Sequence, residues 1–186
     1  MSIDLGEALL RLARDAIGQQ FGMAVPAAPA LKALDEPGAT FVTLTQGGQL
    51  RGCIGTLEAY RPLLRDVQGN AVASAFRDPR FTPLRADELP RTRVEVSLLS
   101  APEPMFFEDE RDAMEQLVPG VDGVILAYDG RRATFLPQVW ESLPEPEQFM
   151  AQLKRKAGLP PVFWHAQLTL ARYQVAKWKE PEATWV

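Results

Sequence analysis

Residues 39–57 read ATFVTLTQGGQLRGCIGTL, and this stretch decides the fold of the first half of the chain. Two strand-like runs flank Gly47 and Gly48, and glycine readily takes the positive φ that a tight turn needs. The pattern predicts a β-hairpin in which residues 39–44 pair with residues 50–57 across a turn that contains the two glycines.

The second strand of this hairpin carries the only cysteine of the chain, Cys53. Side chains alternate across a strand, so Cys53 is expected to share a face with Arg51 and Gly55. A cation close to a thiol favours the nucleophilic thiolate, and the missing side chain at Gly55 is expected to leave room for a ligand. Cys53 and Arg51 are therefore the candidate catalytic residues, with Cys53 as nucleophile or redox centre. A small, buried structural cysteine is the alternative.

Helices and strands alternate along the rest of the chain. Apolar stripes and capping residues predict helices over residues 5–17, 62–77, 110–118 and 147–157. Alternating runs predict strands over residues 93–99, 124–128, 133–136 and 167–175, followed by a polar tail. Hairpins mixed with helices indicate an α+β domain with antiparallel pairing.

The composition is typical of one soluble globular domain covering residues 1–186. Hydrophobic residues make up 46% of the chain and charged residues 24%, and the formal net charge is -4. The absence of a basic half argues against nucleic acid as a partner. The longest apolar runs are too short to span a bilayer, and the N-terminus lacks the pattern of a secretion signal. We therefore expect no membrane partner and a cytoplasmic location.

Three further polar residues are candidates for a ligand site. Asp78 and Arg80 lie in the sequence DPRF after the second predicted helix, where they either line the site or form an ordinary surface ion pair. Glu95 is expected on the polar face of the strand over residues 93–99. Whether this is also the face of Cys53 depends on the strand order, which the sequence leaves open.

His165, the only histidine, is either a general base for Cys53 or a surface or capping residue. One cysteine and one histidine make a metal site only if several carboxylates complete it, so no metal is expected. The chain also lacks a phosphate-cradling glycine loop and a serine nucleophile elbow. The sequence predicts no particular cofactor.

Residues 50–56, LRGCIGT, carry a resemblance to a known family. This segment, called the cysteine segment below, resembles the signature of the AMMECR domain family, whose bacterial and archaeal members are called AmmeMemoRadiSam system protein A. Further matches follow in the family's order, namely DPRF at 78–81, EVS at 95–97, GVDG at 120–123, LPQVW at 136–140 and KAGL at 156–159. The resemblance covers residues 5–178.

The resemblance implies a larger part with an antiparallel sheet flanked by helices, a smaller α/β subdomain packed beside it, and a cleft between the two. It marks the cysteine segment as the functional motif without assigning a role to each residue. It also implies two partners, a dioxygenase-like protein of the Memo type and a radical S-adenosylmethionine enzyme, because their genes lie beside those of the family. The candidate ligand contacts are Gly52, Ile54, Gly55, Thr56, Asp78, Arg80 and Glu95.

Two functions are consistent with these residues. In the first, the chain acts on or holds a small molecule in a cleft around residues 51–56, within a system that includes the two partners. In the second, it is a non-catalytic binding or adaptor protein in that system. A glycine-lined strand suits the close approach of either a ligand or a partner's backbone, so the sequence leaves open whether the protein is an enzyme.

Overall fold

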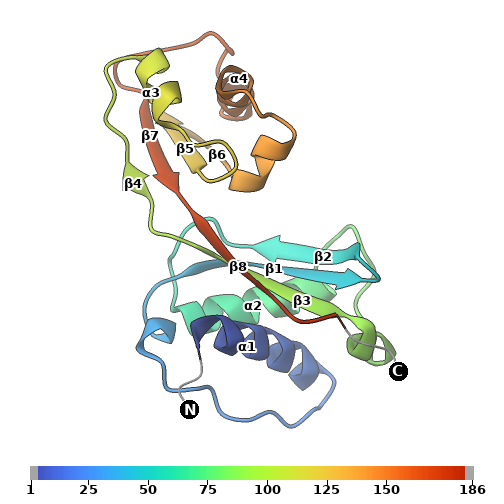
Figure 1. The fold of residues 1–186 in the computed structure, drawn as a ribbon. Helices are drawn as coiled ribbons and strands as arrows, with labels where there is room; N and C mark the ends of the chain where they lie inside the picture. Colours follow the sequence, from blue (N-terminus) through green and yellow to red (C-terminus); the bar gives the residue numbers. More distant parts are fainter. Residues whose placement is uncertain (1–3, 183–186) are drawn as a thin grey trace. The chain divides into compact units, whose positions relative to one another are not determined.

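The computed structural model describes residues 4–182, which divide into two compact units (Figure 1). Unit 1 contains residues 4–99 and 176–182, and unit 2 contains residues 100–175. The described strands form two four-stranded sheets, each accompanied by helices, so the predicted α+β class is confirmed. Among these residues, no helix is long and apolar enough to cross a lipid bilayer. The cleft implied by the resemblance stays a prediction.

Unit 1 is a four-stranded sheet with two helices on one face (Figure 1). The strand order is β2-β1-β3-β8, and β1 pairs antiparallel with both β2 and β3. The strands are β1 (Ala39–Gln46), β2 (Gln49–Gly55), β3 (Arg93–Leu99) and β8 (Val175–Lys179). The helices are α1 (Leu5–Gln20) and α2 (Leu63–Phe76), with the short 3-10 helices η1 (Lys32–Leu34) and η2 (Ala86–Arg91) in the connections.

The core of unit 1 forms because the apolar stripes of both helices pack onto the same face of the sheet. The buried set includes Leu9, Leu12, Ile17, Val67 and Ala71 from the helices and Val42, Leu44, Val94 and Val96 from the strands. Burial of one such aliphatic side chain contributes about 1.5–3 kcal/mol. Asp4 caps α1 as predicted, accepting a hydrogen bond from the N–H of Gly6 at 2.7 Å. The helix continues to Gln20, beyond the predicted end at residue 17.

The predicted hairpin is confirmed. Gly47 and Gly48 form its turn with φ of 56° and 78°, values that glycine takes without strain. The register places Thr43 opposite Cys53. Helix α2 begins after Pro62, whose fixed φ suits the start of a helix, and it ends before the DPRF sequence, as predicted.

Unit 2 has the strand order β4-β7-β5-β6 and a core of its own. Its elements are β4 (Glu103–Pro104), α3 (Glu110–Gln116), β5 (Gly123–Tyr128), β6 (Arg131–Phe135), the 3-10 helix η3 (Pro137–Glu141), α4 (Pro146–Lys156) and β7 (Thr169–Tyr173). In the core, the ring of Phe149 stacks on Trp140 at a centroid distance of 3.8 Å. The β5–β6 hairpin and both helices lie close to their predicted positions.

The polar tail predicted at the C-terminal end is wrong, because residues 175–179 form strand β8. β8 runs antiparallel beside β3, since the N–H of Ser100 donates to the carbonyl of Gln174 at 2.8 Å and that of Glu180 donates to the carbonyl of Val94 at 2.9 Å. The lysines of this strand suggested a polar tail. Its partner strand β3 lies far away in the sequence, so no local pattern indicated the pairing.

Two contacts fix the C-terminal segment to helix α1. The indole of Trp178 packs so closely on Gly6 that a Cβ there would lie 2.2 Å from the ring. The guanidinium of Arg14 binds both carboxylate oxygens of Glu180, at 2.5 and 2.6 Å. The last strand of unit 1 is therefore held by its side chains as well as by the sheet.

We expect Gly6→Ala to destabilise the protein, although alanine is favoured over glycine in a helix by about 1 kcal/mol. The added methyl group would lie 2.2 Å from the Trp178 indole, and overpacking of this kind costs about 1–3 kcal/mol. Gly18→Ala in the same helix is the matched control, since its methyl group meets the flexible side chain of Met23 at 3.1 Å. Urea unfolding should show a loss of stability for the first variant alone. A stabilised Gly6→Ala would contradict this packing of β8 on α1.

Candidate functional site

Cys53, Thr43 and Glu95 lie in three adjacent strands on one face of the unit 1 sheet. Thr43 of β1 is opposite Cys53 of β2 and also opposite Glu95 of β3. Directly opposed residues of antiparallel strands project to the same side, so the strand order places Glu95 on the face of Cys53. Helices α1 and α2 cover the other face (Figure 1). We call the side chains of Cys53, Thr43 and Glu95 the Cys53 face.

The thiol of Cys53 is half-buried and lies 3.3 Å from the hydroxyl oxygen of Thr43, and either group can be the donor. The backbone N–H of Cys53 points away from β1 toward Asp78. In such a non-hydrogen-bonded pair the opposed side chains come closest, which explains the contact between the thiol and the hydroxyl.

The loop over residues 78–81, the DPRF loop, binds the backbone of Cys53 from outside the sheet. Because β2 is an edge strand, the N–H of Cys53 is free to donate to Oδ2 of Asp78 at 2.9 Å, and its carbonyl accepts from Nη2 of Arg80 at 3.2 Å. Asp78 is buried, and Arg80 donates to both of its oxygens, at 3.0 and 2.6 Å. The hydrogen bonds from Arg80 hold the pKa of Asp78 well below its usual range. Asp78 and Arg80 thus occupy an edge that would otherwise be open to association.

Arg51 lies where the pairing of β2 with β1 shifts register, between the pairs Leu44–Gly52 and Thr45–Leu50, so the alternation that predicted a face shared with Cys53 is interrupted. A carboxylate compensates its charge. Its Nε and Nη2 donate to the two oxygens of Glu88 in η2, each at 3.2 Å, and both side chains are largely buried. These hydrogen bonds lower the pKa of Glu88 to about 2. The cation that was expected to favour the thiolate therefore has much of its field cancelled. Sequence reasoning missed Glu88 because nothing local links it to a residue 37 positions away.

The aromatic ring of Phe81 lies near the guanidinium groups of both Arg51 and Arg80. The guanidinium carbon of Arg51 lies 6.0 Å from the centre of the Phe81 ring, and that of Arg80 lies 5.5 Å from it. Both distances are within the range of cation–π attraction. The DPRF match contained this residue, but only the fold shows that its ring is shared by the two cations.

The two glycines of the cysteine segment are required by packing inside the protein. A Cβ on Gly55 would lie 2.2 Å from the ring of Phe41, its partner in β1. The expectation that Gly55 leaves room for a ligand is therefore wrong, because Phe41 fills that gap. A Cβ on Gly52 would lie 2.2 Å from the carbonyl oxygen of Ser74, so β2 and α2 are in close contact at this point.

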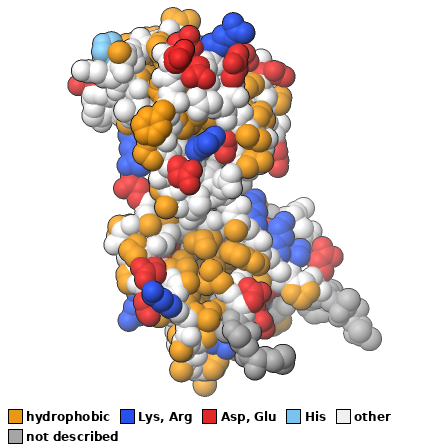
Figure 2. All heavy atoms as spheres, turned by 60° about the vertical axis from the view of Figure 1, so that its left-hand side comes forward, with side chains coloured by type: hydrophobic (Ala, Val, Ile, Leu, Met, Phe, Trp, Pro, Cys, Tyr) orange, Lys and Arg blue, Asp and Glu red, His pale blue; other side chains and the backbone are white. Residues whose placement is uncertain are grey.

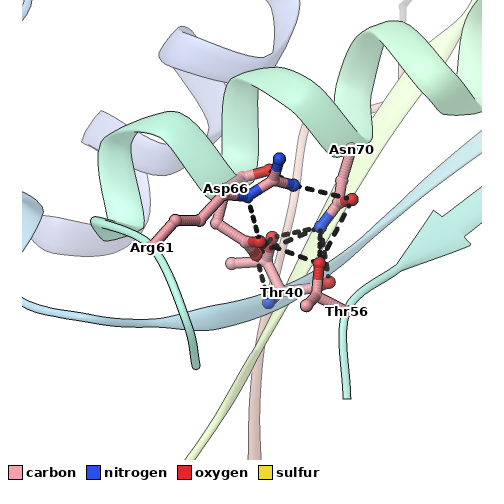
Figure 3. Close-up of polar contacts among 5 residues, drawn as sticks. All are labelled: Thr40, Thr56, Arg61, Asp66 and Asn70. Carbon is pink, nitrogen blue, oxygen red and sulfur yellow. Dashed lines mark hydrogen bonds and ion pairs between the residues drawn. The ribbon is translucent and has the colours of Figure 1, made fainter. Parts of the chain in front are cut away.

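Thr56 ends the cysteine segment in a buried polar network that sequence reasoning missed (Figure 3). Its hydroxyl donates to Oδ1 of Asp66 at 2.8 Å. Asp66 has no exposed surface and also accepts from the N–H and the hydroxyl of Thr40, each at 2.7 Å. Arg61 and Asn70 donate to the same carboxylate at 2.8 and 3.1 Å. The sequence did contain one indication of this network. Asp66 and Asn70 are four residues apart, so they lie one helical turn apart beside the apolar stripe of α2.

The remaining strand candidates also have partners within unit 1. Ile54 is half-buried and lies opposite Val42. The carboxylate of Glu95 pairs with Lys179 at 2.9 Å and with Lys177 at 3.9 Å. Strand β8, which the sequence did not reveal, therefore partly compensates the one acidic residue of the Cys53 face.

His165 has the capping role that the sequence left open. It lies in unit 2, where its Nδ1 accepts a hydrogen bond from the N–H of Gln167 at 3.0 Å. Among residues 4–182, no group of three or more His, Cys, Asp and Glu side chains is placed to hold a metal ion.

The family model described as AMMECR1 matches residues 10–178. The chain belongs to the AMMECR1 family. A protein from Methanothermobacter thermautotrophicus is 39% identical over 140 residues, covering 72% of this chain and 71% of its own length. Protein MK0488 from Methanopyrus kandleri is 32% identical over 195 residues, covering 98% of this chain and 92% of its own length. The crystal structure of uncharacterised protein PH0010 from Pyrococcus horikoshii is similar, with a TM-score of 0.78 and 32% identity, covering 95% of this chain and 92% of that chain. The names of these three proteins state no activity.

Gly55→Ala and Gly52→Ala should each destabilise this AMMECR1 protein by about 1–3 kcal/mol in urea unfolding. In Gly55→Ala the new methyl group meets the Phe41 ring, so Phe41→Ala should relieve part of the loss. The double variant should then be more stable than the sum of the two single losses predicts. In Gly52→Ala the methyl group meets a backbone oxygen, so Phe41→Ala should only add its own loss.

Leu50→Ala is the control for these variants, because it removes an exposed side chain from the same strand. It should change the free energy of unfolding by less than about 0.5 kcal/mol. Glycine variants as stable as the wild type would contradict the packing role and restore the hypothesis of a ligand gap at Gly55.

Proposed function

We propose that this AMMECR1 protein binds a small molecule on the Cys53 face, with the thiol of Cys53 as a contact group rather than a nucleophile. The observation that carries the proposal is the fixed position of this thiol. The DPRF loop binds both the N–H and the carbonyl of Cys53, and Sγ lies 3.3 Å from Oγ1 of Thr43. Groups that are already ordered lose little conformational freedom when a ligand binds, which favours affinity.

The groups beside the thiol favour a polar ligand with one flat or apolar part. The hydroxyl of Thr43 can both donate and accept a hydrogen bond. The Arg80 side chain is 55% exposed, so its guanidinium can bind a carbonyl or acidic oxygen of the ligand while it holds Asp78. The half-exposed ring of Phe81 offers an aromatic surface next to it.

The electrostatics support binding over covalent catalysis. An activated cysteine needs an uncompensated cation or a general base beside it. Glu88 binds Arg51, and Asp78 binds Arg80. Both arginines near the thiol are therefore compensated by carboxylates, which supports a contact role over an activated nucleophile.

The rate of alkylation of Cys53 by iodoacetamide separates a contact group from a nucleophile, since the chain has no other thiol. The variant that combines Arg51→Met and Glu88→Gln removes both members of the ion pair. For a contact group, the alkylation rate at neutral pH should change by less than about threefold, because the two charges already cancel. For a nucleophile activated by Arg51, the rate should fall by about tenfold or more. Arg85→Ala, which removes an exposed arginine paired with Asp87, is the control.

The ligand itself can be sought by equilibrium dialysis of the full chain against a soluble metabolite extract, with mass spectrometry of the retained compounds. The wild type should concentrate a compound that Thr43→Val and Cys53→Ala do not retain. Arg111→Ala, in unit 2, should retain it at the wild-type level. If no retained compound depends on Thr43 or Cys53, the Cys53 face is not the binding site.

The loop after the cysteine segment supports a second function, the binding of protein partners. Leu57 and Tyr60 in this loop are exposed, Tyr60 by 69%. The loop lies on the side of unit 1 that comes forward in Figure 2, where hydrophobic side chains gather. Contiguous exposed hydrophobic surface is typical of interaction sites. The proposed partners are the Memo-type protein and the radical S-adenosylmethionine enzyme that the resemblance implies.

Co-purification with each tagged partner tests this adaptor function. The wild type should be retained by at least one partner, and the variant with Leu57→Ser and Tyr60→Ser should be retained much less. Phe106→Ser, which removes an exposed aromatic side chain from unit 2, should behave as the wild type. Failure of both partners to retain the wild type would count against an adaptor role, as would equal retention of the double variant.

A further inference from the structure

A hollow of about 430 Å³ lies in unit 1 beside the turn of the β1–β2 hairpin. Its walls come from that turn, the end of η2, the start of β3 and the C-terminal segment. The residues that matter for its chemistry are Arg14, Gly47, Gly48, Arg91, Arg93 and Glu180. The volume falls within the range of small-molecule sites, about 300–1,000 Å³. No residue of the cysteine segment lines this hollow, so it is independent of the function proposed for the Cys53 face.

Of the three arginines in the hollow, Arg14 donates its hydrogen bonds to groups of the protein itself. Arg14 binds both oxygens of Glu180, and its Nη2 also donates to the carbonyl of Thr92 at 2.6 Å. The same carboxylate accepts from the N–H of Val94 at 2.9 Å. The hydrogen bonds that Arg14 donates to Glu180 raise the pKa of Arg14, and the two side chains compensate each other.

Arg91 is not compensated in this way. Its side chain is 55% exposed, and among residues 4–182 it pairs only with Glu88, at 3.9 Å. That carboxylate is already bound by Arg51 and by the backbone N–H of Arg85, at 2.9 Å. A contact of 3.9 Å is too long for a hydrogen bond, so the donors of Arg91 remain available to a ligand.

Arg93 also keeps donors for a ligand. Its Nε donates to the backbone carbonyl of Glu180. Its Nη1 lies 3.8 Å from the carboxylate of Glu182, whose side chain is 89% exposed. An exposed carboxylate at this distance contributes little and can move away when an anion binds. Among the residues that the structure describes, Arg91 and Arg93 therefore place two guanidinium groups with open donors in one hollow.

The rest of the lining keeps the hollow open and slightly positive. A Cβ on Gly47 or Gly48 would meet no atom of the described residues within 4 Å, so these residues leave the space around the turn open. The charged residues of the lining are Arg14, Arg91, Arg93, Glu180 and Glu182, so cations outnumber anions. A hollow with this balance attracts a small anion even though the whole chain is acidic.

We propose that this hollow binds a small molecule carrying a phosphate group, held by the guanidinium groups of Arg91 and Arg93. The planar fork of arginine donors matches phosphate oxygens and binds them in a bidentate manner. The volume leaves space beside the phosphate for the rest of a small metabolite. Both arginines are near the surface, so the phosphate group alone is expected to bind weakly and to be sensitive to salt.

Titration of the full chain with inorganic pyrophosphate at low ionic strength, followed by calorimetry, tests the proposal. The wild type should show saturable binding, and Arg91→Ala should weaken it by about tenfold. The side chain of Arg91 makes no hydrogen bond to the described residues, so this variant should fold normally. Arg91→Lys, which keeps the charge but loses the fork, should fall between the two. Arg111→Ala removes an exposed arginine of unit 2 and should bind as the wild type does.

Amide chemical shifts locate the bound anion in the same titration. Pyrophosphate should shift the signals of Gly47, Gly48 and Thr92, and it should leave those of residues 108–115 unchanged. Absence of saturable binding to the wild type would overturn the proposal. It would also be overturned by wild-type affinity in Arg91→Ala, by an equal loss in Arg111→Ala, or by shifts confined to unit 2.

Discussion

The buried carboxylate of Asp66 is the constraint on which the arrangement of unit 1 depends. A charge without solvent contact costs several kcal/mol unless hydrogen bonds compensate it. These bonds come from Thr40 in β1, from Thr56 directly after β2, from Arg61 in the loop before α2, and from Asn70 within α2 (Figure 3). Because the donors belong to different elements, the carboxylate is compensated only when the two strands and the helix lie together. The end of the cysteine segment is thereby fixed to the helix that supports it.

Internal contacts account for most of the cysteine segment. Gly52 allows α2 to approach, Gly55 accommodates Phe41, Thr56 joins the Asp66 network, and Arg51 binds Glu88. Cys53 differs from these residues, because its backbone is bound by the DPRF loop while its thiol remains half-exposed beside a hydroxyl. The residues of this signature therefore serve the packing of an edge strand as well as a candidate site. The functional proposal therefore rests on Cys53 and its immediate neighbours rather than on the whole segment.

The sheet of unit 1 is completed by residues that come last in the chain. The chain leaves unit 1 after Leu99 and returns at Ala176 as β8. Arg14 and Glu180, which hold this strand, are 166 positions apart in the sequence. Contacts over such separations require the closure of a long loop, so they are entropically costly to form and leave no local pattern. The same segment forms one wall of the hollow that contains Arg91 and Arg93.

Local patterns in the sequence determined the β1–β2 hairpin, the Asp4 cap of α1, and the extent of α2 and β3. Each of these depends on interactions between residues close in the chain, where turn geometry and side-chain alternation are sufficient. Only the tertiary structure decided that Glu95 joins the Cys53 face, that Phe41 fills the gap at Gly55, and that Glu88 compensates Arg51. These outcomes depend on strand order and on packing between distant residues, for which hydrophobic periodicity carries no information.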